Sequence, residues 1–238
     1  LVYRVSERHE LATTNVTQTM NQLGFSTYDE LYEYSIQHRD QFWMQSQQAI
    51  GIEWEVPPTA AFTSDNNTYY YPGGRINICN SILKESSNHQ PAIMYGSHPD
   101  NLHSVSVQEL TSLVNQVANA IAMQYQQGTR IAVCLPLSVE AVAIYLGILK
   151  AGSVVVSIAD SFASHEIATR CQIANVSCVV TQDVIQHDTK TIPLYNRVVQ
   201  AMMEPGDNNN SFCSEEKKDE RGTAISIVVV HNKNNNEL

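Results

Sequence analysis

The sequence predicts an α/β protein in which a parallel β-sheet is layered with helices. Three apolar runs, residues 131–137, 154–158 and 177–181, have the length of β-strands. Two stretches with helical character lie between them, so strand, helix, strand, helix and strand follow one another. This alternation is typical of a βαβαβ unit with parallel strands.

Length and charge limit the classes of protein to which the chain can belong. It has 238 residues, of which 43% are hydrophobic, so it can form a sizeable core. The formal net charge is -10 and there is no run of basic residues, which argues against nucleic acid as a partner. The longest apolar block, residues 139–149, is too short to span a bilayer and contains Glu140, so no transmembrane segment is predicted.

The cysteine and histidine residues indicate no metal site. Five cysteines are widely spaced without a CxxC pair, and eight histidines include no HxxxH or HExxH pattern. We therefore expect reduced, mostly buried thiols in a reducing compartment.

Residues 1–58 are expected to form an N-terminal helical extension. A loosely amphipathic stretch comes first, and a second helix begins after the cap Ser26-Thr27, where acidic residues suit the positive helix end. We expect this second helix to run to about Ala49. Farther on, Gly73-Gly74 indicates either a tight turn that needs positive φ or a close backbone approach to a ligand.

A hairpin and the best-defined helix precede the central unit. Residues 91–95 and 102–105 are predicted to pair as strands around a polar turn. Ser106 and Glu109 then have the spacing of a capping box, and apolar residues recur at helical spacing up to Gly128, the expected C-cap.

The two helices of the βαβαβ unit have their own start signals. Ser138 is expected to cap the first, which is apolar all round and therefore predicted to be buried. Ser164 is expected to cap the second, and Asn175 to end it.

The chain changes character after residue 201. Residues 202–238 are rich in Asn and charged residues, which predicts a disordered tail. Within it, residues 224–230 form an isolated β-type run. This run either pairs with a sheet edge or is an aggregation-prone segment.

Common nucleotide-binding motifs are not found. Gly147 and Gly152 have P-loop spacing, but Lys and Ser/Thr do not follow and the segment ends a helix. No GxGxxG or GxSxG occurs. Asp160 lies at the carboxyl end of a predicted strand, where open α/β sheets bind ligands, but a turn or capping role is the favoured interpretation of this residue.

Several segments together resemble the adenylate-forming acyl-CoA synthetase family, in particular the acetyl-CoA synthetase-like branch of plant peroxisomal acyl-activating enzymes. The resemblance covers about residues 26–201, so residues 59–201 would be part of the synthetase N-terminal domain. It is carried by residues 71–83, 130–152, 154–170, 180–184 and 190–201.

The resemblance implies a two-step reaction and an incomplete fold. In the family, a carboxylic acid attacks ATP, with Mg²⁺, to form an acyl adenylate, and coenzyme A then displaces AMP. The family's Ser/Thr/Gly-rich phosphate loop, its adenine and ribose segments and its C-terminal lysine have no counterpart in this sequence. We therefore expect an incomplete N-terminal subdomain in a truncated synthetase that is inactive as this chain, without catalytic residues of its own.

A second hypothesis belongs to a different class of protein. A partial domain leaves apolar surface uncovered, so the chain would be a non-catalytic interaction module for a full-length synthetase or another protein.

Three residues correspond to coenzyme A contacts of the family: Ala159, Asp160 and Lys190. The family usually has small residues at the first place, so the Asp160 carboxylate would repel coenzyme A phosphates. His187 stands where an arginine is common, and solvation at the surface is the alternative role for Lys190.

The family's usual compartment is the peroxisome, reached through a C-terminal tripeptide such as Ser-Lys-Leu. This chain ends in Asn-Glu-Leu, so we expect it in the cytoplasm.

Overall fold

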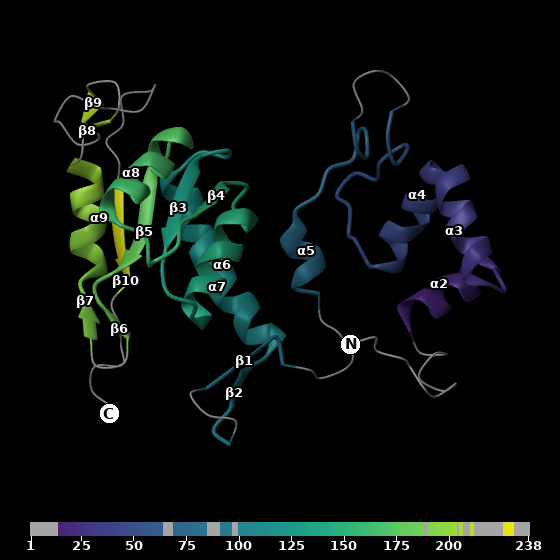
Figure 1. Ribbon diagram of the computed structural model, residues 1–238, viewed down its shortest axis with the longest axis horizontal. Coiled ribbons are helices and arrows are strands. Elements are labelled where there is room, and N and C mark those ends of the chain that lie inside the picture. Colours follow the sequence, from purple (N-terminus) through teal and green to yellow (C-terminus); the bar gives the residue numbers. More distant parts are fainter. Residues whose placement is uncertain are drawn as a thin grey trace. The chain divides into compact units, whose positions relative to one another are not determined.

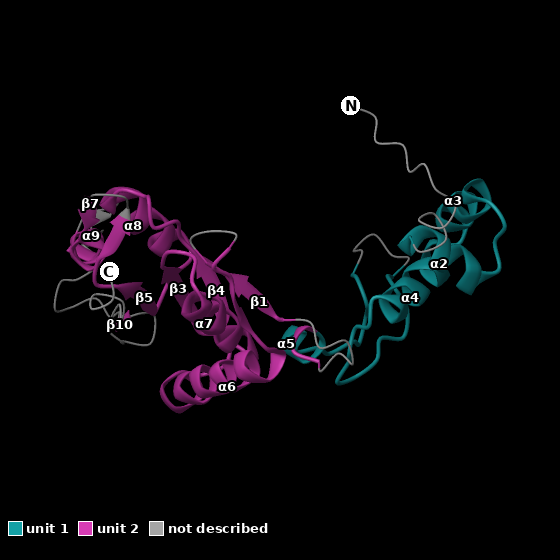
Figure 2. Cartoon of the chain, turned by 90° about the horizontal axis from the view of Figure 1, so that it is seen from below, with its two compact units in different colours: residues 1–81 teal, residues 82–238 magenta. Residues whose placement is uncertain are grey.

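The computed structural model describes residues 14–63, 69–84, 91–96, 100–187, 190–203, 205–206, 210–211 and 226–230. The chain divides into two compact units, residues 1–81 and 82–238, which are described separately (Figure 2). We call them the N-terminal unit and the sheet unit. Along the chain, the division lies downstream of residue 58, where the sequence analysis expects the N-terminal extension to end.

The N-terminal unit is mainly helical. Its helices are α2 (Asn15–Leu23), α3 (Tyr28–Gln37), α4 (Arg39–Ala49) and α5 (Ile78–Ile82), the last of which crosses the division. The prediction of a single helix that runs to Ala49 is wrong. Two helices, α3 and α4, take its place, because the backbone leaves helical geometry at His38, with φ -120° and ψ 49°. Thr27 caps α3 in a capping box with Glu30, as the polar start signal indicates.

The glycine pair of the N-terminal unit forms a turn. Gly73 has φ 74°, and the N–H of Gly74 donates to the carbonyl of Tyr71 at 3.0 Å. A Cβ atom on Gly74 would lie 2.8 Å from Cζ3 of Trp54, so a side chain there would collide with this ring. The turn interpretation therefore accounts for both glycines.

The sheet unit contains the predicted parallel sheet, which confirms the α/β fold class. Four parallel strands lie in the order β10, β5, β3 and β4 (Figure 1). Their bounds are β3 (Arg130–Cys134), β4 (Val154–Ser157), β5 (Cys178–Gln182) and β10 (Ser226–Val230). Because the central strands β3 and β5 are buried on both faces, each contains a run of consecutive apolar residues, Ile131 to Cys134 and Cys178 to Val180, rather than an alternating pattern.

Helices cover both faces of the sheet (Figure 2). On one face, α6 (Val107–Gln124) and α7 (Val139–Lys150) pack against Ile131 and Val133. On the other, α8 (Ser164–Ile173) and α9 (Leu194–Met203) pack against Ala132 and Cys134. Successive side chains of β3 thus pack into the two cores alternately, because neighbouring side chains of a strand point to opposite faces of the sheet.

Three small antiparallel pairs surround this layered core. The expected hairpin is present as β1 (Ile93–Tyr95) and β2 (His103–Val105). The others are β6 (Ile185–His187) with β7 (Lys190–Ile192), and β8 (Pro205–Gly206) with β9 (Asn210–Ser211).

Three helix caps differ from those expected. Ala174, rather than Asn175, is the C-cap of α8, and Asn175 follows it with φ 48°. Tyr125, rather than Gly128, is the C-cap of α6, and Gly128 adopts φ 80° in the turn before β3. Ala163 caps α8, and Ser164 is its first helical residue. A glutamate three residues after the cap, Glu166, accepts a hydrogen bond from the Ala163 N–H at 3.0 Å. This bond is the half of a capping box that needs no side-chain acceptor at the cap position, so alanine is compatible with it.

The tail beyond residue 201 contributes a strand to the sheet. β10 pairs in parallel with β5 over five residues, with Val228 opposite Val180. Of the two alternatives for residues 224–230, pairing with a sheet edge and an aggregation-prone segment, the structure therefore shows the first for β10. The remaining tail, apart from β8 and β9, lies outside the described residues.

Candidate functional site

The carboxyl end of β4 leads into a tight turn that contains two predicted site residues. The N–H of Phe162 donates to the carbonyl of Ala159 at 3.1 Å, which places Asp160 within the turn. Ala159 is exposed and Asp160 is half-buried. The turn role considered for Asp160 is present, and its position at the carboxyl edge of the sheet agrees with the expected ligand side.

Arg197 of α9 holds this turn from the neighbouring helix. Its Nη1 donates to the backbone carbonyls of Asp160 at 2.8 Å and Phe162 at 3.3 Å. From α8, the guanidinium of Arg170 lies over the Phe162 ring, 3.9 Å from the centroid. The segment between β4 and α8 is thus fixed by two arginines from two helices.

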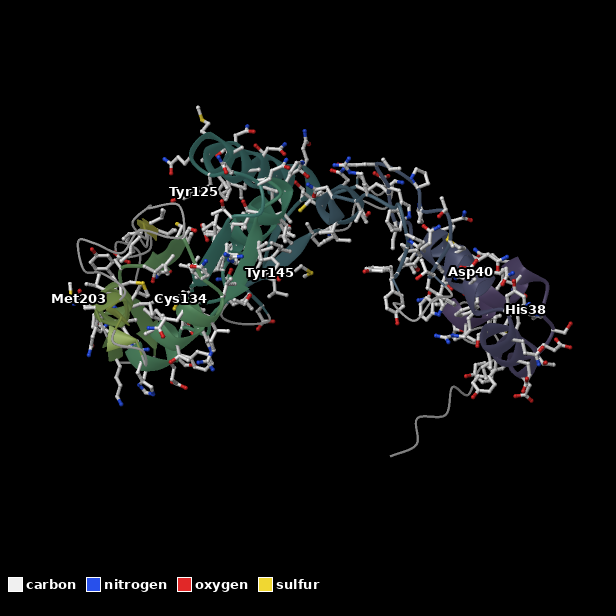
Figure 3. All side chains as sticks on the ribbon, turned by 90° about the horizontal axis from the view of Figure 1, so that it is seen from above. His38, Asp40, Tyr125, Cys134, Tyr145 and Met203 are labelled. Atoms are coloured by element: carbon white, nitrogen blue, oxygen red, sulfur yellow. The ribbon has the colours of Figure 1, made fainter. Side chains whose placement is uncertain are left out.

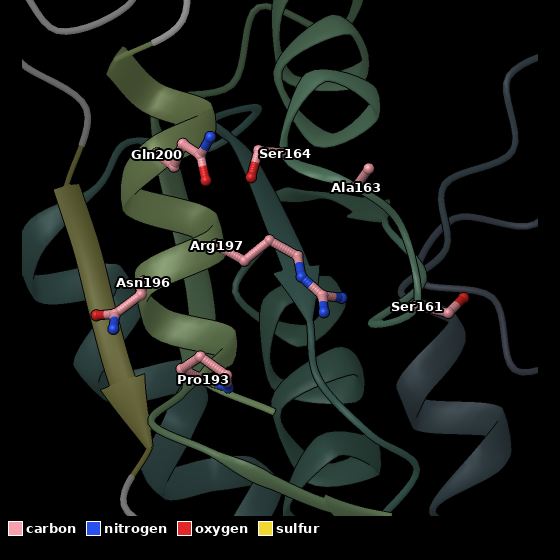
Figure 4. Close-up of a pocket in the computed structure, with 7 residues that line it drawn as sticks. All are labelled: Ser161, Ala163, Ser164, Pro193, Asn196, Arg197 and Gln200. Carbon is pink, nitrogen blue, oxygen red and sulfur yellow. The ribbon is translucent and has the colours of Figure 1, made fainter. Parts of the chain in front are cut away.

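A polar pocket lies beside the turn, between the β4–α8 segment and α9 (Figure 4). Its volume is about 410 Å³. The lining residues come from the turn and the start of α8, and from one side of α9 with the residue before it: Ser161, Ala163, Ser164, Pro193, Asn196, Arg197 and Gln200.

Lys190 lies apart from this pocket. It begins β7, where it pairs with His187 across the β6–β7 hairpin, and its side chain is exposed. Within the described residues, no hydrogen bond or ion pair joins Lys190 to Asp160. The structure therefore brings together Ala159 and Asp160, whereas Lys190 belongs to a separate hairpin.

Cys134, which lies in the sheet unit (Figure 3), also contacts this turn. Its Sγ donates to the Ala159 carbonyl at 3.9 Å. Burial above all, together with the negative charge of Asp160, raises the pKa of Cys134 to about 12, although the positive charge of Arg197 acts in the opposite direction. The thiol is therefore protonated at neutral pH and is not a nucleophile.

Sequence reasoning missed Arg197 and gave Ser164 only a capping role. Neither residue belongs to a recognised motif, and Arg197 is 37 positions away from Asp160. The only local signal is that Arg197 falls on the helix that follows Pro193, near a predicted contact.

Metal ligands and membrane spans were also sought in the part of the chain that the structure describes. No group of three or more His, Cys, Asp or Glu side chains there is arranged to hold a metal ion. None of the described helices is both long and apolar enough to cross a membrane.

Two family models match the chain. The model described as acetyl-coenzyme A synthetase N-terminus matches residues 28–82, and the model described as AMP-binding enzyme matches residues 83–235. The second match runs past residue 201, at which the sequence analysis expects family sequence to end. The boundary between the two matches lies next to the division between the two compact units.

Curated relatives share about a third of the matched residues. "Probable acyl-activating enzyme 18, peroxisomal" from Arabidopsis thaliana is 33% identical over 184 residues, which are 74% of this chain and 25% of that protein. "Hexanoyl-CoA synthase" from Cannabis sativa is 33% identical over 189 residues, with coverages of 74% and 26%. The chain therefore spans about a quarter of the length of these relatives.

A solved structure has the same fold. Acetoacetyl-CoA synthetase from Streptomyces lividans superimposes with a TM-score of 0.76 over 94% of this chain and 34% of that protein, at 18% identity. The fold and the matches define a layered α/β segment of an adenylate-forming enzyme. The chain belongs to the AMP-binding enzyme family.

Proposed function

We propose that this chain forms the N-terminal part of an AMP-dependent acyl-CoA synthetase and does not catalyse acid activation by itself. In the family reaction, a carboxylic acid, ATP and coenzyme A give acyl-CoA, AMP and pyrophosphate. The observation that carries the proposal is the match of the AMP-binding model to residues 83–235, in a chain that covers about a quarter of its relatives.

The lack of activity follows from electrostatics. Transfer of an adenylyl group requires cations and backbone donors around the reacting phosphates. The 238 residues contain no Ser/Thr/Gly-rich loop that ends in Pro-Lys. No step through ATP or Mg²⁺ is therefore assigned to this chain.

A pyrophosphate-release assay tests this proposal. The purified chain is incubated with ATP, Mg²⁺ and short or medium carboxylic acids, with an active full-length acyl-CoA synthetase as the positive control. We expect no pyrophosphate above the background without enzyme. Turnover that depends on the acid would contradict the proposed inactivity.

We further propose that Ala159, Asp160 and Lys190 contribute the edge of a coenzyme A site. Ala159 and Asp160 lie at the carboxyl end of β4, where the turn is fixed by Arg197. In calorimetry with coenzyme A, we expect Lys190→Ala to abolish the heat of binding. Lys150→Ala, at the opposite end of the strands, serves as the control and should change nothing. Absence of heat with the unaltered chain would remove this part of the proposal.

The alternative, an interaction module, is supported by large apolar side chains on the sheet unit. Met123, Leu137 and Ile173 are 87%, 93% and 82% exposed. If this alternative holds, the chain should coelute with a full-length synthetase in size-exclusion chromatography, and Leu137→Ser should weaken this association. The cytoplasmic location also stays a prediction, and the Arabidopsis relatives carry the word "peroxisomal" in their names.

A further inference from the structure

We propose that two copies of this chain associate through the outer edge of β10, with their β10 strands antiparallel about a twofold axis at Val228. The outer edge is the side of β10 that faces away from β5. Within the described residues, no other strand pairs with it. The inference goes beyond the proposed function, because it uses neither the coenzyme A contacts nor any step of the family reaction.

β10 lacks the features that usually protect the edge of a sheet. Its five residues, 226–230, include no charged side chain and no proline. It pairs with β5 residue by residue over its whole length, so no bulge turns its edge away. Ile227 packs against one core and Val230 against the other. β10 thus has the composition of a strand inside a sheet, and the backbone groups that β5 does not pair can bond a further strand.

A second β10 strand fits this edge, because the strand is complementary to itself in antiparallel orientation. A twofold axis at Val228 places this residue opposite its copy, Ile227 opposite Val229, and Ser226 opposite Val230. None of these pairs brings like charges together, and β-branched side chains pack well on adjacent strands. The Val228 side chain is 43% exposed, and the second copy covers it. The contact uses the same patch on both chains and therefore closes as a dimer.

A stripe of side chains on α9 extends this edge. Tyr195, Val199 and Met203 follow one another at intervals of four residues and therefore share one side of the helix. Arg197 and Gln200, which line the pocket, lie on the other flank, which faces the β4–α8 segment. The stripe thus faces away from α8, toward the outer edge of β10 (Figure 1). Two of its three side chains are exposed, Tyr195 by 39% and Met203 by 65%.

The spacing of the elements leaves room for both copies of α9. This helix shares a core cluster with Val179 of β5 and Ile227 of β10, so it lies across these two strands. Neighbouring strands are about 4.8 Å apart and packed helices about 8–10 Å apart, so one helix covers two strands. Across the twofold axis the two α9 helices therefore lie side by side. Val199 is then next to its copy, and Tyr195 is next to Met203 of the other chain, a favourable sulfur–aromatic contact.

The charge of the whole chain opposes this contact and gives it a distinctive salt dependence. Each copy has a formal net charge of -10, whereas β10 and the stripe on α9 are uncharged. Repulsion between two such copies is screened by salt. Dimerisation should therefore become stronger as the ionic strength rises, whereas binding of a basic partner to this acidic chain should become weaker.

Sedimentation velocity of the full chain over a range of protein concentrations measures the association. We expect the monomer in equilibrium with a species of twice its mass. Val228→Lys should weaken dimerisation at least about tenfold, because it places two ammonium groups opposite each other in the contact. Val154→Lys is the matched control. Val154 is 46% exposed on β4, the strand at the other end of the sheet, and its replacement should leave the dissociation constant unchanged.

A mixture of Val228→Lys and Val228→Glu tests the position of the axis. Each variant alone should be monomeric, and an equimolar mixture should form dimers again, because the axis pairs the ammonium group with the carboxylate. Circular dichroism shows whether each variant is folded. If both are folded and their mixture stays monomeric, the axis at Val228 is refuted.

Met203→Lys covers the case in which a charge on β10 prevents folding, because it leaves the strand intact and its charge suits the end of a helix. It should weaken dimerisation several-fold with an unchanged circular dichroism spectrum. An unaltered chain that stays monomeric at every soluble concentration refutes the proposal. Species larger than a dimer that Val154→Lys removes show pairing at both ends of the sheet, which refutes the closed contact. A monomeric chain that binds a full-length synthetase, with loss of binding in Val228→Lys, assigns the edge to that partner and refutes the dimer.

Discussion

Cys134 and Cys171 share one buried core cluster but lie on different elements, β3 and α8. Burial raises the pKa of each thiol to about 12. For Cys171 the negative charge of the Cys134 thiolate adds to the effect of burial. At the residue scale, position in the core therefore decides that these sulfur atoms act as apolar filling.

We expect both thiols to resist iodoacetamide at neutral pH in the folded chain and to react once the chain is unfolded. Because the pKa of both thiols is higher in the folded chain than in the unfolded chain, this contribution to stability is complete below the ordinary thiol pKa. It is lost as the pH rises toward about 12. Mass spectrometry of alkylated peptides, with and without denaturant, checks this. Rapid native labelling of Cys134 would contradict its burial.

At the scale of single elements, the start of α6 is stabilised by a reciprocal cap. The Ser106 hydroxyl accepts from the Glu109 N–H at 3.2 Å, while the Glu109 carboxylate accepts from the Ser106 N–H at 2.9 Å. The Ser106 backbone bond, followed by its hydroxyl, lowers the pKa of Glu109. Because the folded pKa lies below the unfolded one, the stabilisation is present above the unfolded pKa and is lost as the pH falls through the folded pKa.

Ser106→Ala should therefore lower the free energy of unfolding by about 1 kcal/mol at neutral pH and by less at acidic pH. Ser138→Ala is the control, because Ser138 caps α7 through the Ala141 N–H at 3.1 Å without a carboxylate in return. Its cost should stay constant as the pH falls. Urea unfolding at neutral and acidic pH separates the two variants. Equal pH profiles would exclude the bond that the Ser106 hydroxyl donates to the Glu109 carboxylate at 2.7 Å as the cause.

The contact between α6 and α7 depends on Gly147. A Cβ atom at this position would lie 2.5 Å from Cγ1 of Val117 and 3.2 Å from the Val114 carbonyl. We expect Gly147→Ala to destabilise the sheet unit by about 1–3 kcal/mol through overpacking, although alanine favours helices. Adding Val117→Ala removes the colliding methyl groups and should reverse part of this loss in a double-mutant cycle. A stabilising Gly147→Ala would mean that the two helices separate without cost.

At the scale of the whole molecule, β10 closes one side of the sheet. It covers β5, whose Val179 is fully buried, and Ile227 packs against the core that contains α8 and α9. Without β10, the long apolar strand β5 would become an exposed edge, which favours aggregation.

A chain that ends at residue 225 should lose at least about 2 kcal/mol of unfolding free energy, since several backbone hydrogen bonds disappear at roughly 1 kcal/mol each. A chain that ends at residue 230 keeps β10 and serves as the control. Thermal melts and thioflavin T fluorescence measure stability and aggregation. Identical melting of both variants would show that β10 does not stabilise the sheet unit.

The edge of the sheet at which the candidate site lies could be predicted from the sequence, because ligands in open α/β sheets approach the carboxyl ends of strands. Ala159 and Asp160 were predicted at such an end and lie there. Arg197 and the pocket role of Ser164 could not be predicted, since the contact between Arg197 and Asp160 joins residues 37 positions apart. Local patterns contain no signal for such a pairing.

The sequence alone determined the elements and their class. Apolar runs, helical spacing and capping residues act over a few neighbouring positions, and they specified β3, β4, β5, α6 and α7 with small errors at the ends. The tertiary structure alone decided that β10 pairs with β5 and that α9 brings Arg197 to the turn after β4. These contacts depend on the path of the whole chain, because sheet edges and helix faces find their partners through packing between distant segments.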